Sequence, residues 1–340
     1  MLYQPKIVAE AAPDFYAMRT GTRRTSAHPL AEQLTGHQIG LAYGALHARV
    51  MPHHNDQQIF ALGIATTQFS RLLAESQMVP VQRAYEAQAA HLRFTSSISV
   101  DNYMPTDLLG PMDPVIELEP VNELAQISSF LGVKTGTSIK GAKLERFARL
   151  VGFSEQAIVN DSLDDVSRFI RDLGVSAARK ECKMVCEALE SNPTDEDAVP
   201  LFDSALLNVL AEPLTAPHLG TALSYLRKQR LPNGGLSDLA ARHLIVAADL
   251  EMTARDIVSN AGLEIEIQPQ AHLPDGRWYV LANPEVQPVV GVLRLRGTEN
   301  PVRVDQTKRP INYDGAWVRV RADLGAVLVS SVGIVRGGTV

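Results

Sequence analysis

The chain has 340 residues, of which 45% are hydrophobic and 21% charged, so it can bury a sizeable core without disulfides or a metal ion. Its formal charge is −6, from 32 Lys and Arg against 38 Asp and Glu. This balance excludes a protein that mainly coats nucleic acid, because such binding depends on many Lys and Arg contacts to phosphate. Domains average about 150 residues, so we expect two of them.

Targeting and membrane signals are missing from the sequence. The first six residues, Met1 to Lys6, lack the charged-then-apolar order of a signal peptide. No apolar run approaches the roughly 18 residues that a membrane-spanning helix needs. We expect a chain that is neither secreted by the usual route nor embedded in a membrane.

Catalytic and cofactor-binding motifs are also missing. The sequence has no Gly-x-Gly-x-x-Gly after a predicted strand, no Gly-x-Ser-x-Gly and no His-Glu-x-x-His. Five of the nine His lie within the first 54 residues, but no carboxylates or thiols accompany them at ligand spacing. We therefore predict no enzymatic activity, no cofactor and no metal site.

The two cysteines, Cys182 and Cys186, lie four residues apart in a helical pattern and therefore share one helix face. A metal pair would need further His or Cys ligands nearby, and the surrounding sequence supplies no such cluster. We expect two small apolar core residues with free thiols, which suits a chain that folds in a reducing cytoplasm.

The first part of the chain is loosely patterned. Residues 1–58 are punctuated by prolines and contain one helix-like stretch over 29–50, so we expect this segment to pack on a neighbouring subunit. Residues 66–93 have helical spacing that Pro80 interrupts. Residues 97–101 alternate like a strand, and a long projecting hairpin is predicted with its sides at 117–121 and 130–139.

The strongest helical pattern runs over residues 164–192, from a capping-box-like start to an Asn-Pro stop. Its polar side has a partly basic stripe, for which a solvated face is the simplest interpretation and weak contact with a polyanion the alternative. Four acidic residues dilute the stripe: Asp172, Glu181, Glu187 and Glu190.

The remaining sequence alternates helices and strands. Thr215 is predicted to cap a helix that stops near 231–235, and Asp249 to open a helix that ends at Gly262. Strands are predicted at 243–248, 277–281, 289–295, 317–322 and 326–335.

Several segments carry a resemblance to a known family through their order and spacing. These are Phe153 to Leu163 before the long helix, Leu201-Phe202 with Asn208, Arg242 to Glu251, Trp278 to Ala282, Asp314-Gly315, Val318-Arg319 and Asp323 to Gly325. With them, the chain resembles the major capsid proteins of tailed bacteriophages with the Hong Kong 97-type fold over roughly residues 64–337. It is most similar to the Mu-like major head subunit group.

The resemblance implies an α+β fold whose parts follow one another along the chain. They are an N-terminal arm over 1–95, an extended β-hairpin loop over 96–150, a peripheral domain with a long spine helix over 151–200, an α/β axial domain over 201–300, and strands over 301–340 that return to the peripheral domain.

The resemblance also implies a structural, non-enzymatic function. Many copies would assemble into pentamers and hexamers of an icosahedral shell that encloses double-stranded DNA. The implied partners are other copies, a scaffolding protein or head protease during assembly, the portal, a decoration protein, and packaged DNA held weakly and without specificity. The protein would fold and assemble in the host bacterial cytoplasm and end in the virion.

Candidate assembly residues are Lys134, Lys140 and Lys143 in the extended loop, and Arg168, Arg171, Arg179 and Lys183 on the long helix. Some family members crosslink a loop Lys to an Asn of a neighbour, but nothing here identifies the acidic catalyst or the Asn, so solvated Lys are the simpler interpretation.

Two alternative functions remain open for the chain. One is a cytoplasmic α/β enzyme with residues 200–300 as its catalytic domain, and the other is an encapsulin-like nanocompartment shell.

Overall fold

The computed structural model describes residues 67–109, 138–153, 163–194, 200–231, 235–298, 300–306 and 316–338. The chain divides into two compact units, and each is assembled from separate stretches of sequence. The first holds residues up to 88 with 146–178 and 300–322, and the second holds 89–145, 179–299 and 323–340. The predicted arm before residue 67 and most of the predicted hairpin lie outside the described residues.

In the first unit a helix lies against a three-stranded sheet. Helix α4 (Thr67–Gln88) contacts strand β10 (Val302–Gln306). Strand β10 pairs antiparallel with β11 (Ala316–Leu324), which neighbours β4 (Glu145–Phe153). Buried residues alternate with charged ones along β10 and β11, as period-2 strands with one covered face require. The alternating buried residues are Val302, Val304, Val318, Val320 and Ala322, and Asp323 and Leu324 at the end of β11 are buried as well.

The predicted interruption at Pro80 is wrong. Helix α4 runs without a break and contains Pro80 in its interior. A proline in a helix interior costs about 3 kcal/mol, since it removes one backbone hydrogen bond and crowds the preceding turn. Val81 and Tyr85, which follow it, are almost fully buried, so the packing of this turn offsets that cost.

Gly174 sets how closely helix α6 (Leu163–Glu190) approaches α4 within the first unit. A Cβ atom at Gly174 would overlap the backbone carbonyl oxygen of Val81, whereas a Cβ at Gly220 of α7 (Ala216–Lys228) would meet open space. We expect Gly174→Ala to lower the free energy of unfolding by about 1–3 kcal/mol through overpacking. Gly220→Ala should raise it by about 0.8–1 kcal/mol through helix propensity. Urea denaturation checks both signs, and a stabilising Gly174→Ala would contradict the close approach.

The second unit is centred on a five-stranded mixed sheet of order β5-β13-β8-β6-β7. Strands β13 and β5 are parallel, β13 and β8 antiparallel, β8 and β6 antiparallel, and β6 and β7 parallel. Their bounds are Val209–Leu210 for β5, Ile334–Gly337 for β13, Trp278–Ala282 for β8, Ala241–Ala247 for β6 and Glu266–Gln270 for β7.

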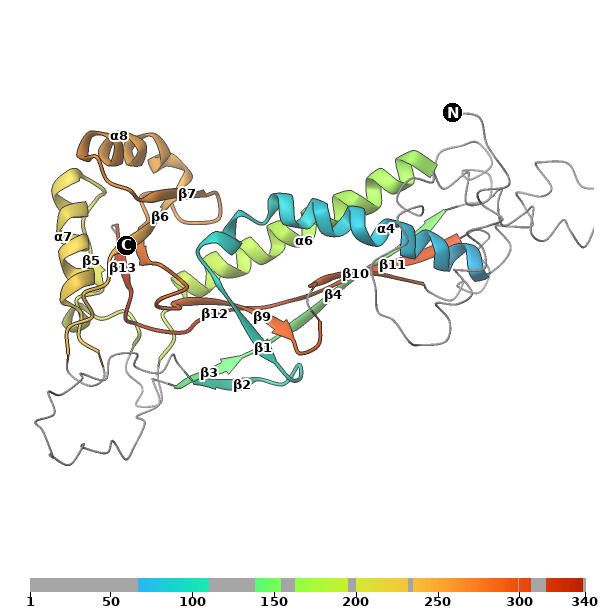
Figure 1. Ribbon diagram of the computed structural model, residues 1–340, viewed down its shortest axis with the longest axis horizontal. Helices are drawn as coiled ribbons and strands as arrows, with labels where there is room; N and C mark the ends of the chain where they lie inside the picture. The colour runs from blue at the N-terminus through green and yellow to red at the C-terminus, as the bar shows by residue number, and fades with distance from the viewer. Residues whose placement is uncertain are drawn as a thin grey trace, which may run out of the picture. The chain divides into compact units, whose positions relative to one another are not determined.

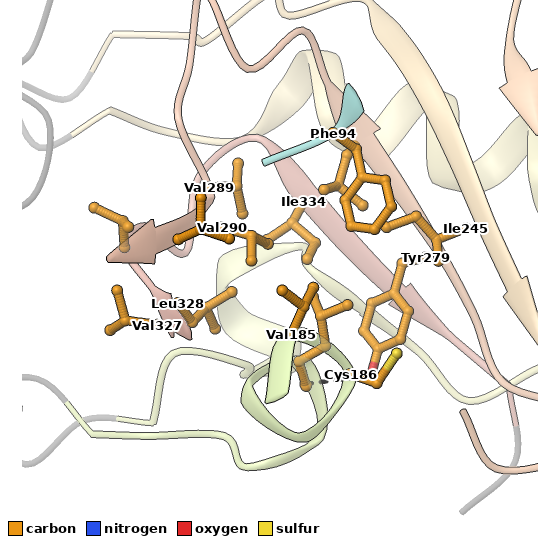
Figure 2. Packing of buried hydrophobic residues seen from close by; sticks show 14 of the residues in the cluster. Phe94, Val185, Cys186, Ile245, Tyr279, Val289, Val290, Val327, Leu328 and Ile334 are labelled. Carbon is orange, nitrogen blue, oxygen red and sulfur yellow. Dashed lines mark hydrogen bonds between the residues drawn. The ribbon is translucent and has the colours of Figure 1, made fainter. Parts of the chain in front are cut away.

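Both faces of this sheet are buried, and alternate residues of its strands divide between them. Trp278, Val280 and Val246 pack with residues of α7 and of α8 (Glu251–Ala261), which lie beside the sheet in Figure 1. Tyr279 and Ile245 point to the other face, where they meet Val185 and Cys186 from the second half of α6 (Figure 2). This helix–sheet–helix layering explains why β8 and residues 244–247 of β6 are continuously apolar.

Two smaller sheets complete the second unit. Strand β9 (Val290–Leu295) pairs in parallel with β1 (Ser96–Val100) and antiparallel with β12 (Ala326–Leu328). A Cβ atom at Gly291 would overlap the end of the Ile98 side chain, so a larger residue there would require that side chain to move. Strands β2 (Thr106–Leu109) and β3 (Ser138–Ala142) form an antiparallel pair at the base of the predicted projecting hairpin.

Most predicted helices and strands among the described residues are confirmed. Thr215 caps α7 by accepting a hydrogen bond from the backbone N–H of His218, and α8 ends at Gly262 with a left-handed φ of +61°. A short 3₁₀ turn, η4 (Ala248–Leu250), precedes α8, and similar turns are η2 (Ala90–Arg93) and η3 (Ser204–Leu206).

The prediction of one strand over residues 326–335 is wrong. The segment forms two strands, β12 and β13, which belong to different sheets. Between them Ser330 Oγ accepts the backbone N–H of Val332 at 3.0 Å, and Gly333 takes a φ of +93°. This local hydrogen bond and the positive φ turn the chain, and an apolar pattern alone does not reveal such a turn.

Candidate assembly surface and a buried charged cluster

The basic residues of α6 predicted to act in assembly are all exposed. Arg168 and Arg171 lie on the part of α6 in the first unit, and Arg179 and Lys183 on the part in the second unit. Lys183 Nζ lies 3.7 Å from Glu187 Oε1, one turn along the helix. Such an exposed pair contributes only about 0.3–0.5 kcal/mol, so it leaves Lys183 available to another partner.

The lysines predicted in the extended loop are only partly described. Lys143 is exposed, and its Nζ lies 3.5 Å from Glu145 Oε1. The backbone of Lys140 belongs to β3, and Lys134 lies outside the described residues. An assembly role for these lysines therefore stays a prediction.

A cluster that the sequence did not suggest lies in the second unit. Glu181 of α6 is fully buried, and its carboxylate accepts a hydrogen bond from Arg294 Nη2 at 3.1 Å and lies 2.9 Å from His91 Nε2. The sequence interpretation of Glu181 as a solvated charge is wrong. The helix period could have revealed it, because Glu181 lies three residues after buried Ala178 and four before buried Val185.

The cluster balances its charges internally. Burying a lone carboxylate costs several kcal/mol, so it requires a close and well-aligned partner, which the Arg294 guanidinium of β9 supplies. Burial lowers the pKa of His91, but interactions with Cys182 and Glu181 outweigh this effect, and the net result is a raised pKa. The cluster ties η2 and β9 to α6.

The raised pKa of His91 makes its contribution to stability depend on pH. Because the pKa of His91 is higher in the folded chain than its ordinary value of 6.5, protonated His91 contributes fully to the free energy of unfolding below pH 6.5. This contribution is lost as the pH rises through the pKa of the folded state. We expect the difference in unfolding free energy between wild type and His91→Gln to shrink from about pH 5.5 to about pH 8.5. Urea denaturation of both proteins at each pH measures this difference, and one that grows with pH would contradict the assigned direction.

A second charged group holds the end of α6 to the sheet. Glu190 Oε1 accepts a hydrogen bond from the Tyr279 hydroxyl at 2.7 Å and lies 3.1 Å from Arg277 Nε. Arg336 Nη2 lies 3.8 Å from the other oxygen, and its guanidinium lies over the Phe202 ring at 5.4 Å from the centroid. Glu190 is therefore a structural tie rather than a solvated charge.

The enzyme alternative predicts a deep pocket with reactive groups in residues 200–300. A half-open hollow of about 540 Å³ lies there, with a mainly aliphatic lining that includes Leu223, Leu239 and Val286. Of its charged groups, Arg227 is paired with Asp238 at 2.8 Å. The lining has no Cys, Ser or His, so it offers no Ser–His or Cys–His pair, and its titratable side chains are Arg227, Arg242 and Glu264.

Two further observations concern the described residues alone. No three His, Cys, Asp or Glu side chains among them are grouped so that they could hold a metal ion. Within the same residues, no helix combines the length and apolarity needed to cross a bilayer.

Comparisons with known proteins give one family and several similar structures. The sequence model of a family described as phage capsid protein matches residues 137–337. A virus-like particle from Pyrococcus furiosus has 11% sequence identity and a TM-score of 0.51, with 77% of this chain and 97% of that chain covered. Residues 137–337, which the phage capsid family model matches, make up more than half of the sequence.

Two other solved structures are similar at lower scores. The capsid of the cyanophage P-SCSP1u has 11% identity and a TM-score of 0.47, with 74% of this chain and 88% of that chain covered. A phage-related protein from Bordetella bronchiseptica has 9% identity and a TM-score of 0.48, with 76% and 95% covered. Among curated proteins, none matches the sequence.

Proposed function

The chain belongs to the phage capsid protein family, and from this premise we propose that it is the major head subunit of a tailed bacteriophage. The observation that carries the proposal is the family match over residues 137–337. The fold similarity to a virus-like particle subunit, which is covered over 97% of its length, supports it. We further propose the Hong Kong 97-type fold and membership of the Mu-like group, on the segments from Phe153 to Gly325 quoted above.

The proposed fold assigns a role to each part of the chain. The 28-residue helix α6 would be the spine helix of a peripheral domain over 151–200. The sheet flanked by α7 and α8 would form the axial domain over 201–300, to which the last segment adds strand β13. Of the return strands expected over 301–340, residues 301–322 would return to the peripheral domain. The two discontinuous units support such a return, because residues 300–322 join the unit that also contains 146–178. Residues 1–95 would be the arm and 96–150 the extended loop.

The proposed partners follow from a container that holds DNA. Copies would form pentamers and hexamers through interfaces that involve many neighbours, with scaffolding protein or head protease, portal and decoration protein as further partners. A chain with a net charge of −6 should not bind packaged double-stranded DNA tightly, so any contact with it should be weak and sensitive to salt. The shell would assemble in the host cytoplasm and remain in the virion.

Imaging tests the proposed assembly. The full chain is expressed alone and with scaffold, and the products are examined by negative-stain electron microscopy. We expect closed shells of uniform size, and small oligomers under all conditions would contradict the proposal. Nuclease-protected DNA in particles from a natural source supports a phage head, whereas protein cargo without DNA would support the nanocompartment alternative.

The exposed basic residues of α6 allow a sharper test within the same assay. We expect Arg179→Glu with Lys183→Glu to reduce the assembled fraction at least tenfold if this face binds a neighbour. Lys228→Glu, at an exposed residue at the end of α7, serves as the matched control and should assemble like wild type. Equal assembly of the double variant and the control would remove Arg179 and Lys183 from the proposed surface.

A further inference from the structure

The sheet of the first unit has one covered face and one open face, and the open face is rich in arginine. The valines of β10 and β11 are buried on the covered side, where α4 contacts β10 (Figure 1). Because side chains alternate along a strand, the residues between these valines point to the opposite side. They are Arg303 and Asp305 on β10 and Arg319 and Arg321 on β11, and none of the four is fully buried.

The pairing of the two strands brings like charges together on this open face. Arg303 lies directly opposite Arg321, and Asp305 lies opposite Arg319. Asp305 Oδ2 is 2.8 Å from Arg321 Nε and 3.5 Å from Arg319 Nη2, so two guanidinium groups share one carboxylate. Among the described residues no carboxylate forms an ion pair with Arg303. Like charges directly opposite each other weaken a pair of strands, so this arrangement does not serve folding.

The neighbouring strand β4 extends the same face. A Cβ atom at Gly152 would overlap the ring of Trp317, so Gly152 lies on the side to which Trp317 and then Arg319 point. Arg146 is exposed and precedes Gly152 by an even number of residues in β4, so it points to this side too. Four arginines therefore face one aspartate here, although the net charge of the whole chain is −6.

The open face lacks the apolar centre that a protein partner usually requires. Stable protein–protein interfaces have an apolar core inside a polar rim. Between the arginines of β10 and β11 the apolar residues are the valines, which are buried on the other side. Trp317 lies against Gly152, and Leu150 of β4 is a single leucine with 45% of its surface exposed. Surfaces that bind nucleic acid are more polar and more positively charged, as this face is.

We propose that the open face, defined by Arg146, Arg303, Arg319 and Arg321, is the surface through which the subunit contacts the phosphate backbone of double-stranded DNA. This inference rests on the proposed function, which supplies DNA as the contents of the shell. A guanidinium group binds two phosphate oxygens at once, which makes arginine well suited to phosphate recognition.

The distribution of the charges favours an extended ligand over a small anion. Residues two apart in a strand are about 6.4–6.8 Å apart, so the guanidinium groups are spread over the face and do not converge on one point. DNA presents a phosphate about every 3.4 Å along each strand, so several arginines can contact different phosphates. Phosphate contacts carry no sequence information, and Asp305 repels the same phosphates. The contact is therefore weak, sensitive to salt and independent of sequence.

The salt dependence of DNA binding tests the proposal on the full chain. Soluble subunits, separated from shells by size-exclusion chromatography, are titrated into a fluorescein-labelled duplex of about 30 base pairs, and anisotropy is measured from about 25 to 200 mM NaCl. Arg303→Gln with Arg319→Gln leaves the ion pair of Arg321 and Asp305 in place. We expect this double variant to bind about tenfold more weakly or worse at about 50 mM NaCl. The slope of log K against log salt should fall by about 2, since each lost phosphate contact removes about 0.9.

A substitution of opposite sign separates lost contacts from general damage to the sheet. Asp305→Asn removes the carboxylate that repels phosphate and that two arginines share, so it should strengthen binding to the same duplex. Weaker binding of Asp305→Asn would overturn the proposal. Circular dichroism of each variant establishes that the chain is folded.

Arg179→Gln with Lys183→Gln is the matched control, because it removes the same charge from exposed positions of α6. It should change the affinity for DNA by less than about threefold, and a loss equal to that of the sheet variant would overturn the proposal. Negative-stain imaging of the sheet variant should show shells as in wild type. Loss of shells with unchanged DNA binding would assign the face to an acidic segment of a second copy and overturn the proposal.

The two proposals fail in different ways. Wild-type shells combined with equal DNA binding by wild type and the Arg303→Gln, Arg319→Gln variant would overturn the DNA-contact surface and leave the capsid function standing. Wild type that forms no shells under any condition would contradict the capsid function, whatever its affinity for DNA.

Discussion

Replacing Glu181 with Gln is expected to lower the free energy of unfolding by about 3–5 kcal/mol, because it leaves a buried charge without its partner. Arg294, whose side chain is 11% exposed, would lose the carboxylate that neutralises it, and His91 would lose the acceptor at 2.9 Å. Urea denaturation of the full chain at neutral pH, followed by circular dichroism, measures the effect.

Glu187→Gln is the matched control on the same helix. Its carboxylate is exposed and pairs weakly with Lys183 at 3.7 Å, so its loss should change the free energy of unfolding by less than about 0.5 kcal/mol. If both substitutions had equal effects, Glu181 would behave as a surface charge, and the buried cluster would be contradicted.

Replacing Trp278 with Ala is expected to destabilise the chain by about 3–5 kcal/mol through the cavity it leaves. The indole is 0% exposed between β13 and the helices α7 and α8, and its Nε1 donates to the Glu212 carbonyl oxygen at 3.1 Å. Gly337 lies so close to the indole that a Cβ atom there would overlap the ring, so little relaxation can fill the space from that side.

Met252→Ala provides the comparison for Trp278→Ala. Met252 lies on α8 with 68% of its surface exposed, so its truncation should change stability by less than about 0.5 kcal/mol. Thermal and urea denaturation of the two variants separate the expected effects. A small loss for Trp278→Ala would contradict the position of Trp278 at the centre of the sheet.

Local signals in the sequence were enough to predict the helices that have strongly periodic apolar residues and capping residues. The 28-residue α6 and the cap at Thr215 follow from the spacing of apolar residues and from the hydroxyl that accepts an N–H. Strands β4, β7 and β10 were not predicted, and β7 contains Pro269, which strand patterns normally exclude. As an edge strand β7 needs fewer backbone donors, and this depends on the topology of the sheet.

The buried cluster depended on contacts between distant residues. Glu181 is 90 residues from His91 and 113 residues from Arg294 along the chain, so no local motif joins the three residues. The same holds for the hydrogen bond that Cys182 Sγ donates to Gln270 Oε1, which joins residues 88 apart. Only the helix period around Glu181 contained a local signal, and a charged residue at a core position is unusual enough to call for a partner.

A cryo-electron microscopy map of particles purified from cells that express the chain with scaffold is the most direct test of whether this protein builds a capsid shell. We expect a closed icosahedral shell of pentamers and hexamers, in which each subunit has helix α6 and the five-stranded sheet β5-β13-β8-β6-β7. A purified product that consists only of small, discrete oligomers with no shell would contradict it.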